Sequence, residues 1–232
     1  MKAALATFLV PFMLCAADES KLVAQWSFEN SAGEVVRDSV NFNDGVVKGT
    51  GKLIFEKGPT GNAAVFDNGK NFIRVADSPA LALTDDFTIS CFIKPSKVDG
   101  YNTILWKGDR LAKPEKINYY LDIKDGIVEL KGKDAAGEWI MCVTKSPVIV
   151  AGKWQHIEVV FSKGKVDISV NGEVQKTSFS GKNKTFDGNS FIANNSELII
   201  GNGAIIASNT GYPFCGAIDE VKIYNNSFID IK

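Results

Sequence analysis

A single histidine in 232 residues, and no two cysteines at short spacing, leave this chain without the usual ligands of a zinc site. It also lacks an excess of positive charge, since 26 Lys and Arg are balanced by 27 Asp and Glu for a net charge of −1. Binding to a phosphate backbone relies on such an excess, so nucleic acid is not expected as a partner. Beyond the N-terminus no segment offers the ~18 uninterrupted apolar residues of a membrane-spanning helix.

The first 17 residues have the features of an export signal. Lys2 supplies a short positive segment, residues 3–14 are apolar, and Cys15-Ala16-Ala17 supplies small residues for cleavage. Lipid attachment to Cys15 is disfavoured relative to simple cleavage, because Leu14 stands where a lipid-attachment signal has Gly, Ala or Ser. We therefore expect residues 1–17 to be a signal peptide and the protein to be exported, whether secreted, periplasmic or at the cell surface.

Removal of that segment leaves Cys91, Cys142 and Cys215. An odd number of cysteines in an exported protein allows one disulfide and one thiol, or no disulfide. In residues 87–93 the alternation of side chains puts Cys91 on the same face as apolar neighbours, which predicts a small buried hydrophobic residue.

Short runs rich in aromatic and β-branched residues, broken by Gly, Asn, Asp or Pro, predict strands and no helices. The runs in the first half are 22–28, 63–66, 72–75, 87–94 and 103–107. In the second half, Asp125-Gly126, Lys163-Gly164 and Asn171-Gly172 separate alternating segments, as tight hairpin turns do. Consecutive antiparallel strands at this spacing predict an all-β protein, a two-sheet antiparallel β-sandwich of jelly-roll type.

Several ordered blocks carry a family resemblance. The chain reads Trp26-Ser27-Phe28-Glu29 near its start, Trp154-Gln155-His156-Ile157 in the middle, and Gly216-Ala217-Ile218-Asp219-Glu220-Val221 near its end. These blocks resemble laminin G-like, concanavalin A-like jelly-roll domains of exported microbial proteins, in order, from about residue 22 to residue 225. The resemblance implies one such domain over residues 18–232. It also implies a non-catalytic carbohydrate-binding or adhesion module for an extracellular polysaccharide or other glycan, or alternatively a glycan-active enzyme of the same fold.

The residues favour the binding module over the enzyme. Glycosidases of this sandwich class carry Glu, Asp and Glu at alternate positions of one strand, which places the acid and the nucleophile in one cleft ~5–5.5 Å apart. That triplet is missing here, and the adjacent Asp219 and Glu220 point to opposite faces unless the strand has a bulge. His156 and Glu158 do share a face, but a lone strand histidine is usually a packing residue. We therefore assign no catalytic residue.

Calcium is the cofactor to consider, because residues 29–45 are rich in the oxygen ligands that it prefers. In the resembling domains this loop is often tied by an ion to the Asp of the closing strand, which implies Asp38, Asn43 and Asp219 as ligands of a structural Ca²⁺. The alternative is that the loop residues only form turns and that Asp219 caps a neighbouring backbone. Both interpretations stay open.

Ligand binding is expected from exposed aromatic rings. Sugars present apolar C–H faces edged with hydroxyls, so an aromatic ring flanked by polar residues binds them without a deep cavity. Trp26 and Trp154 belong to the strand blocks and are expected to pack in the core. The candidate ligand-binding residues are Tyr101, Trp106, Trp139 and Tyr212.

Overall fold

The computed structural model describes residues 21–226 apart from residues 30, 32, 163, 181–189 and 204–210. The expected signal peptide lies outside the described residues. Within them, strands dominate, a short 3₁₀ helix, η2, spans Pro79–Leu81, and no helix is long and apolar enough to cross a membrane.

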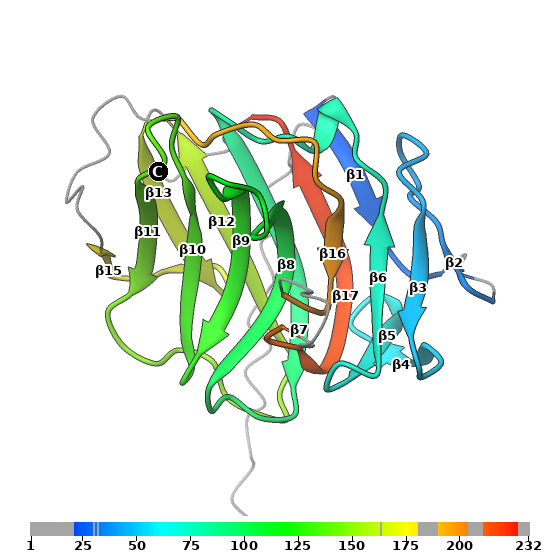
Figure 1. Cartoon of the computed structure of the whole chain (residues 1–232). Coiled ribbons are helices and arrows are strands. Elements are labelled where there is room, and N and C mark those ends of the chain that lie inside the picture. The colour runs from blue at the N-terminus through cyan, green and yellow to red at the C-terminus, as the bar shows by residue number, and fades with distance from the viewer. Residues whose placement is uncertain are drawn as a thin grey trace, which may run out of the picture.

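Two antiparallel sheets face each other as a sandwich, which confirms the predicted fold class (Figure 1). The sheet at the back of this view has eight strands in the order β14-β13-β12-β7-β17-β5-β4, with β1 also paired to β17. Its strands are β1 (Leu22–Trp26), β4 (Ile54–Gly58), β5 (Gly61–Asp67), β7 (Phe87–Pro95), β12 (Gln155–Ser162), β13 (Lys165–Val170), β14 (Glu173–Val174) and β17 (Cys215–Tyr224).

The sheet at the front has nine strands in the order β15-β11-β10-β9-β8-β16-β6-β3-β2. Its strands are β2 (Val35–Val36), β3 (Gly45–Gly49), β6 (Asn71–Val75), β8 (Tyr101–Asp109), β9 (Lys116–Lys124), β10 (Ile127–Lys133), β11 (Trp139–Thr144), β15 (Thr177–Ser180) and β16 (Leu198–Ile200). Neighbours in both sheets are often far apart in sequence, as a jelly roll requires.

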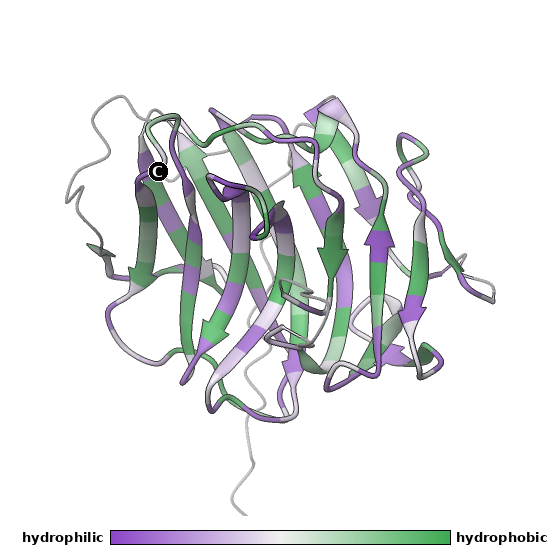
Figure 2. Cartoon of the chain, viewed as in Figure 1, coloured by the Kyte–Doolittle hydropathy of each residue, from purple (hydrophilic) through white to green (hydrophobic). Residues whose placement is uncertain are grey.

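The core fills the space between the sheets because each strand alternates an inward apolar residue with an outward one (Figure 2). Aromatic rings meet at its centre, where Phe87 stacks on Phe161 with centroids 5.1 Å apart and Phe191 packs edge-on against Phe161 at 5.1 Å. Such pairs contribute about 0.5–1.5 kcal/mol beyond the area that they bury. Trp26 is fully buried, as predicted. The same prediction for Trp154 is wrong, because its ring is only partly buried outside the core and has the Lys94 ammonium 5.4 Å from its centroid.

The hairpin turns follow the sequence signals. Asp125 and Gly126 have φ values of 52° and 80°, which lie in the left-handed region that this turn type needs. The turn pairs Lys124 with Ile127, and the pairing then continues without a shift along β9 and β10. This register decides which side chains of the two strands stand opposite each other.

The closing strand β17 contains a β-bulge at its two adjacent acidic residues, Asp219 and Glu220. The register against β7 shifts between Asp219 and Lys222, and Glu220 has a φ of 50°. The two carboxylates nevertheless turn to different partners. Glu220 accepts a hydrogen bond from the Gln25 side chain at 2.9 Å, whereas Asp219 accepts bonds from Thr60 at 3.2 Å.

All three cysteines of the expected mature chain are free. Cys91 and Cys142 are buried, the first as predicted, and Cys215 is partly exposed. Burial raises the pKa of the Cys91 and Cys142 thiols to about 12, so both behave as small apolar residues at neutral pH.

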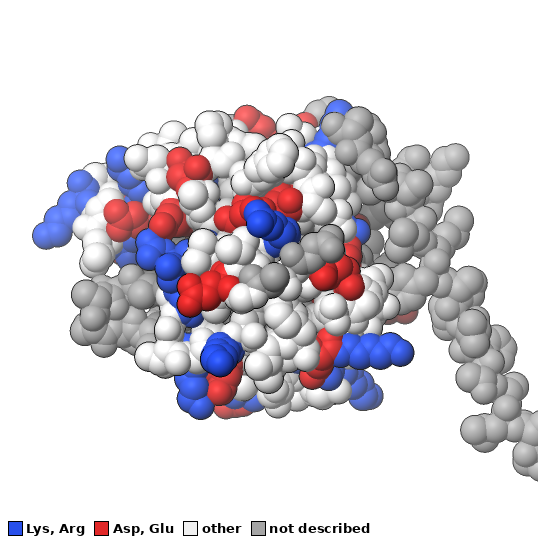
Figure 3. Space-filling view, turned by 90° about the vertical axis from the view of Figure 1, so that its right-hand side faces the viewer, with Lys and Arg blue, Asp and Glu red and all other residues white. Residues whose placement is uncertain are grey.

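On the side of the sandwich next to β2, β3 and β4, positive and negative side chains are interspersed (Figure 3). Arg37 and Asp44, which directly follow β2 and precede β3, form one ion pair there. A mixed surface of this kind differs from the one-sign track that binds a nucleic acid backbone.

Candidate functional site

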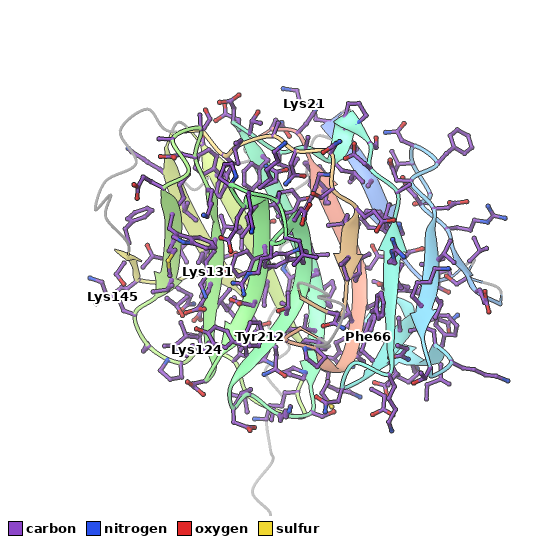
Figure 4. All side chains as sticks on the ribbon, viewed as in Figure 1. Lys21, Phe66, Lys124, Lys131, Lys145 and Tyr212 are labelled. Atoms are coloured by element: carbon purple, nitrogen blue, oxygen red, sulfur yellow. The ribbon has the colours of Figure 1, made fainter. Side chains whose placement is uncertain are left out.

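A small hollow opens on the outer face of the nine-stranded sheet, over β8, β9 and β10. Its volume is about 80 Å³. The residues that line it are Tyr101, Thr103, Trp106, Arg110, Tyr120, Asp122, Lys131 and Tyr212. Figure 4 labels Lys124, Lys131 and Tyr212 on this face of the sheet.

Aromatic rings surround the hollow. Tyr101 packs against Tyr212 with centroids 4.8 Å apart, and Trp106 packs against Tyr120 at the same separation. Trp139 extends this second pair, because its ring stands edge-on to Tyr120 at 6.2 Å. Strands β8, β9 and β11 and the segment before β17 thus bring the aromatic candidates of the sequence to one place.

These rings differ in how much they show to solvent. Tyr212 is 44% exposed, Tyr101 and Trp139 are partly buried, and Trp106 is only 3% exposed. The Trp106 indole also donates a hydrogen bond from Nε1 to the Gly108 carbonyl oxygen at 3.0 Å. Trp106 therefore forms a wall of the hollow, while Tyr101, Trp139 and Tyr212 leave ring surface open to a ligand.

The floor of the hollow is a buried cluster of charged groups. Asp122 and Glu129 lie opposite each other on β9 and β10, and both face the ammonium of Lys131. Glu129 forms an ion pair with Lys131, and Asp122 Oδ1 lies 3.6 Å from Lys131 Nζ. The three residues are 1%, 8% and 3% exposed, in the order Asp122, Glu129 and Lys131. Burial raises the pKa of Asp122 well above its usual value, and the charge of Lys131 opposes that shift only in part.

Cations also lie against the aromatic rings. Lys131 Nζ is 5.0 Å from the Tyr101 ring centroid and 5.4 Å from that of Tyr120. At the rim, Lys124 Nζ lies 5.1 Å from Tyr101, and the Arg110 guanidinium lies 5.6 Å from Trp106. These separations fall within the ~6 Å range of cation–π attraction, which fixes the rings and the charges relative to each other.

The predicted metal ligands are only partly brought together. Asp38 Oδ2 accepts hydrogen bonds from the backbone N–H of Asn43 at 3.0 Å and from its side-chain amide at 2.8 Å. The other oxygen, Oδ1, accepts bonds from the N–H groups of Gln25 and Val40, both at 2.9 Å. Asp219 bonds to the turn between β4 and β5 instead. These are the hydrogen bonds expected if the loop residues form turns and Asp219 caps a neighbouring backbone. Calcium binding stays a prediction.

In the described part of the chain, no group of three or more His, Cys, Asp or Glu side chains is arranged to hold a metal ion. Asp219 still has one unsatisfied oxygen, because its Oδ1 is buried without a hydrogen-bond partner. Burial is also the main cause that raises the pKa of Asp219 to about 6.

His156 and Glu158 lie on the outer face of the other sheet, away from the hollow. The ring of His156 is hydrogen-bonded through Nε2 to Ser90 Oγ at 2.7 Å and packs against Phe92 at 4.6 Å. Burial and then the charge of Lys222 lower the pKa of His156 to about 4, so the ring is neutral at pH 7. Its contacts are those of a packing residue, as expected from the sequence.

Sequence reasoning missed Arg110, Tyr120, Asp122 and Lys131, although a signal for most of them was present. The Asp125-Gly126 turn fixes the hairpin register, which places Tyr120 opposite Lys131 and Asp122 opposite Glu129. Counting outward from that turn identifies the polar residues of one face. Arg110 lies in the loop after β8, where no such count applies.

Comparison with known proteins agrees with the observed fold. The family described as the concanavalin A-like lectin/glucanases superfamily, in its Laminin G-like branch, matches residues 67–229. No curated protein sequence matches the chain. Domain 4 of AbnA, a GH43 extracellular arabinanase from Geobacillus stearothermophilus solved in complex with arabinotriose, is similar at 27% identity and a TM-score of 0.67, covering 90% of this chain and 94% of that one.

Toxin binding domains share the fold at lower identity. The binding domain of Paraclostridial Mosquitocidal Protein 1 is 18% identical with a TM-score of 0.66, and covers 91% of this chain and 50% of that one. The botulinum neurotoxin serotype D ligand binding domain, solved with N-acetylneuraminic acid, is 16% identical with a TM-score of 0.65. The match covers 91% of this chain and 49% of that one. The chain thus spans about half the length of these toxin domains.

Proposed function

Because the chain belongs to the concanavalin A-like lectin/glucanase superfamily, we propose that it is an exported module that binds an extracellular glycan and does not cleave it. The observation that carries this proposal is the convergence of Tyr101 and Tyr212 on one polar hollow, with the partly buried Trp139 beside it against Tyr120. Open rings beside buried polar groups fit a ligand with an apolar face and a hydroxyl-bearing edge, and a sugar has both.

The likeness to domain 4 of the arabinanase supports the proposal. That domain was solved with arabinotriose, a short sugar oligomer, and the two chains cover nearly all of each other. A sugar on the rings around the hollow would exchange hydrogen bonds with water for bonds with protein, and an open platform removes little area from solvent. We therefore propose modest affinity for each module and stronger retention on a polysaccharide with many sites.

A second candidate is a glycan-active enzyme, and one feature favours it. Asp122 and Glu129 form a pair of carboxylates on the face that carries the hollow. Glycoside hydrolases use two carboxyl groups, set ~5–5.5 Å apart for retention or ~6.5–9.5 Å for inversion. Here both carboxylates face one ammonium, that of Lys131, beneath the aromatic rings. This arrangement suits charge balance in a floor better than attack on a sugar above it.

The test combines a glycan panel with a cleavage assay on the same polysaccharides. We expect retention of the protein on at least one extracellular polysaccharide and no release of reducing ends. Release that is lost in Asp122→Asn or Glu129→Gln, and kept in Glu158→Gln, would establish the enzyme in place of the binding module. Absence of retention on every glycan would contradict the proposal.

A further inference from the structure

The size of the hollow limits what part of a glycan enters it. Its 80 Å³ is far below the ~300–1,000 Å³ of pockets that enclose a whole small molecule. A bound sugar ring would therefore lie across the open faces of Tyr101 and Tyr212, and only a substituent of that ring would reach down between them. The groups that line the hollow decide which substituent it accepts.

The floor supplies little net charge to such a substituent. Lys131 is the cation of the floor, and Glu129 and Asp122 both face it. Burial raises the pKa of Asp122, which reduces the negative charge that a neighbouring anion would meet. The positive charge of Lys131 is thus already balanced within the floor, which leaves no spare cation there for an anionic substituent.

Arg110, in the wall of the hollow, is the other cation that lines it. Its Nε atom is buried and has no hydrogen-bond partner among the described residues, and no acidic side chain of that part of the chain forms an ion pair with it. The nearest acid in sequence, Asp109, is occupied by its own loop, because Oδ1 accepts the backbone N–H groups of Leu111 at 2.7 Å and Ala112 at 3.1 Å. The guanidinium rests beside Trp106 at 5.6 Å and lines the hollow.

A guanidinium presents its N–H groups as a planar fork that matches a carboxylate with two parallel hydrogen bonds. Lys124, at the rim above Tyr101, adds a second positive charge near the opening. The Thr103 side chain also lines the hollow and offers a hydroxyl.

We infer that the glycan bound at this site is acidic, and that the carboxylate of a uronic or sialic acid unit enters the hollow and pairs with Arg110. This inference rests on the proposed function and adds the chemical class of the ligand. The rings hold the sugar by its apolar face, and Arg110 selects the charged substituent.

The test uses matched pairs of glycans. Homogalacturonan fragments are compared with the same fragments after reduction of their carboxyl groups to alcohols, and sialyllactose is compared with lactose. We expect at least tenfold tighter binding of the carboxylated member in one pair, and that pair identifies whether a uronic or a sialic acid is the source. The preference should weaken as salt is raised from low to high ionic strength, because the ion pair is screened.

Two failures are distinguishable. Equal or tighter binding of neutral glycans, lost in Tyr212→Ala, would overturn the acidic ligand and leave the glycan-binding function in place. Retention of no glycan of either kind would contradict the function, and the inference would fall with it.

Variants of Arg110 give the second test. Arg110→Gln should abolish the preference for the carboxylated member, and Arg110→Lys, which keeps the charge without the fork, should weaken it several-fold. Arg37→Gln is the matched control, since it removes the same charge from an arginine that pairs with Asp44 outside this site. An unchanged preference in Arg110→Gln and Arg110→Lys, with folding confirmed by circular dichroism, would overturn the inference.

Discussion

Asp122 and Glu129 stand directly opposite each other on β9 and β10, and both turn their carboxylates to the ammonium of Lys131. The register that the Asp125-Gly126 turn imposes creates this juxtaposition. The same register puts Tyr120 opposite Lys131 and so sets an aromatic ring over the charged cluster. The floor of the hollow and the position of Tyr120 over it therefore depend on a single turn.

Replacement of Lys131 by Met should be strongly destabilising. Lys131 is 3% exposed, and its loss leaves the buried carboxylate of Glu129 without its counter-ion and Asp122 without a neighbouring cation. Loss of one partner from a buried ion pair costs about 3–5 kcal/mol, so we expect a fall of that size in the free energy of unfolding at pH 7. Urea unfolding measures it. The deficit should shrink at lower pH, because protonation of the carboxyl groups removes the uncompensated charge.

Lys124→Met is the control for that measurement, since Lys124 is a partly exposed lysine at the rim, outside the buried cluster. Its unfolding free energy should stay close to that of the wild type. Equal stability of Lys131→Met and Lys124→Met at pH 7 would show that the cluster is not the buried ion group described above.

Trp106→Ala should destabilise the fold as well as the site. The ring is 3% exposed, packs on Tyr120, and donates a hydrogen bond to the Gly108 carbonyl. Truncation of a buried aromatic ring costs about 3–5 kcal/mol, and we expect the lower end because one side of this ring faces the hollow. Chemical denaturation of Trp106→Ala against Phe42→Ala, whose ring is 93% exposed, checks the value. A midpoint equal to that of Phe42→Ala would contradict the burial of Trp106.

The free energy of unfolding should decrease as the pH rises from about 4 to about 6, because Asp219 titrates in this range. Burial raises the pKa of Asp219 to about 6 in the folded state, against about 4 in an unfolded chain. The folded state therefore binds the proton more tightly, and the free energy of unfolding decreases as the pH rises through this window, by up to about 1.4 kcal/mol per pH unit. Asp219→Asn should flatten that decrease. Parallel pH profiles for the two proteins would refute the assignment.

Calcium binding at Asp38, Asn43 and Asp219 is open to a separate test. An ion that binds the folded state raises its stability by mass action. If the site exists, a chelator lowers the melting temperature and Asp219→Asn removes that sensitivity. Identical melting curves with calcium and with a chelator would reject the site and leave Asp38 as the organiser of its turn through the bonds to Val40 and Asn43.

The sequence was sufficient for the fold and for Tyr101, Trp106 and Tyr212 among the rings that line the hollow, but not for Tyr120. The reasons are local. Alternation along β12 and β13 fixed the inward faces, and turn dipeptides such as Asp125-Gly126 fixed the hairpins. The strand register set by that turn also determines the cluster of Asp122, Glu129 and Lys131. The alternate positions of one strand, where a glycosidase carries its acids, do not reveal the cluster, because its two acids lie across two strands.

The rest of the site depends on tertiary packing. Tyr212 reaches Tyr101 because the Thr103 backbone N–H donates to the Tyr212 carbonyl oxygen at 3.0 Å, a contact between segments more than a hundred residues apart. Arg110 reaches Trp106 from a loop whose course is set by the hydrogen bonds of Asp109. Neither approach follows from periodicity or turn chemistry.

The affinity of Tyr212→Ala for the best-retained glycan, measured by isothermal titration calorimetry beside wild type and Phe42→Ala, tests the central claim most directly. Tyr212 is 44% exposed, lines the hollow, and contributes its ring rather than its backbone to the site, so the variant should keep its stability. We predict at least tenfold weaker binding, which corresponds to about 1.4 kcal/mol, with Phe42→Ala unchanged from wild type. Affinity of Tyr212→Ala equal to that of the wild type would contradict the account.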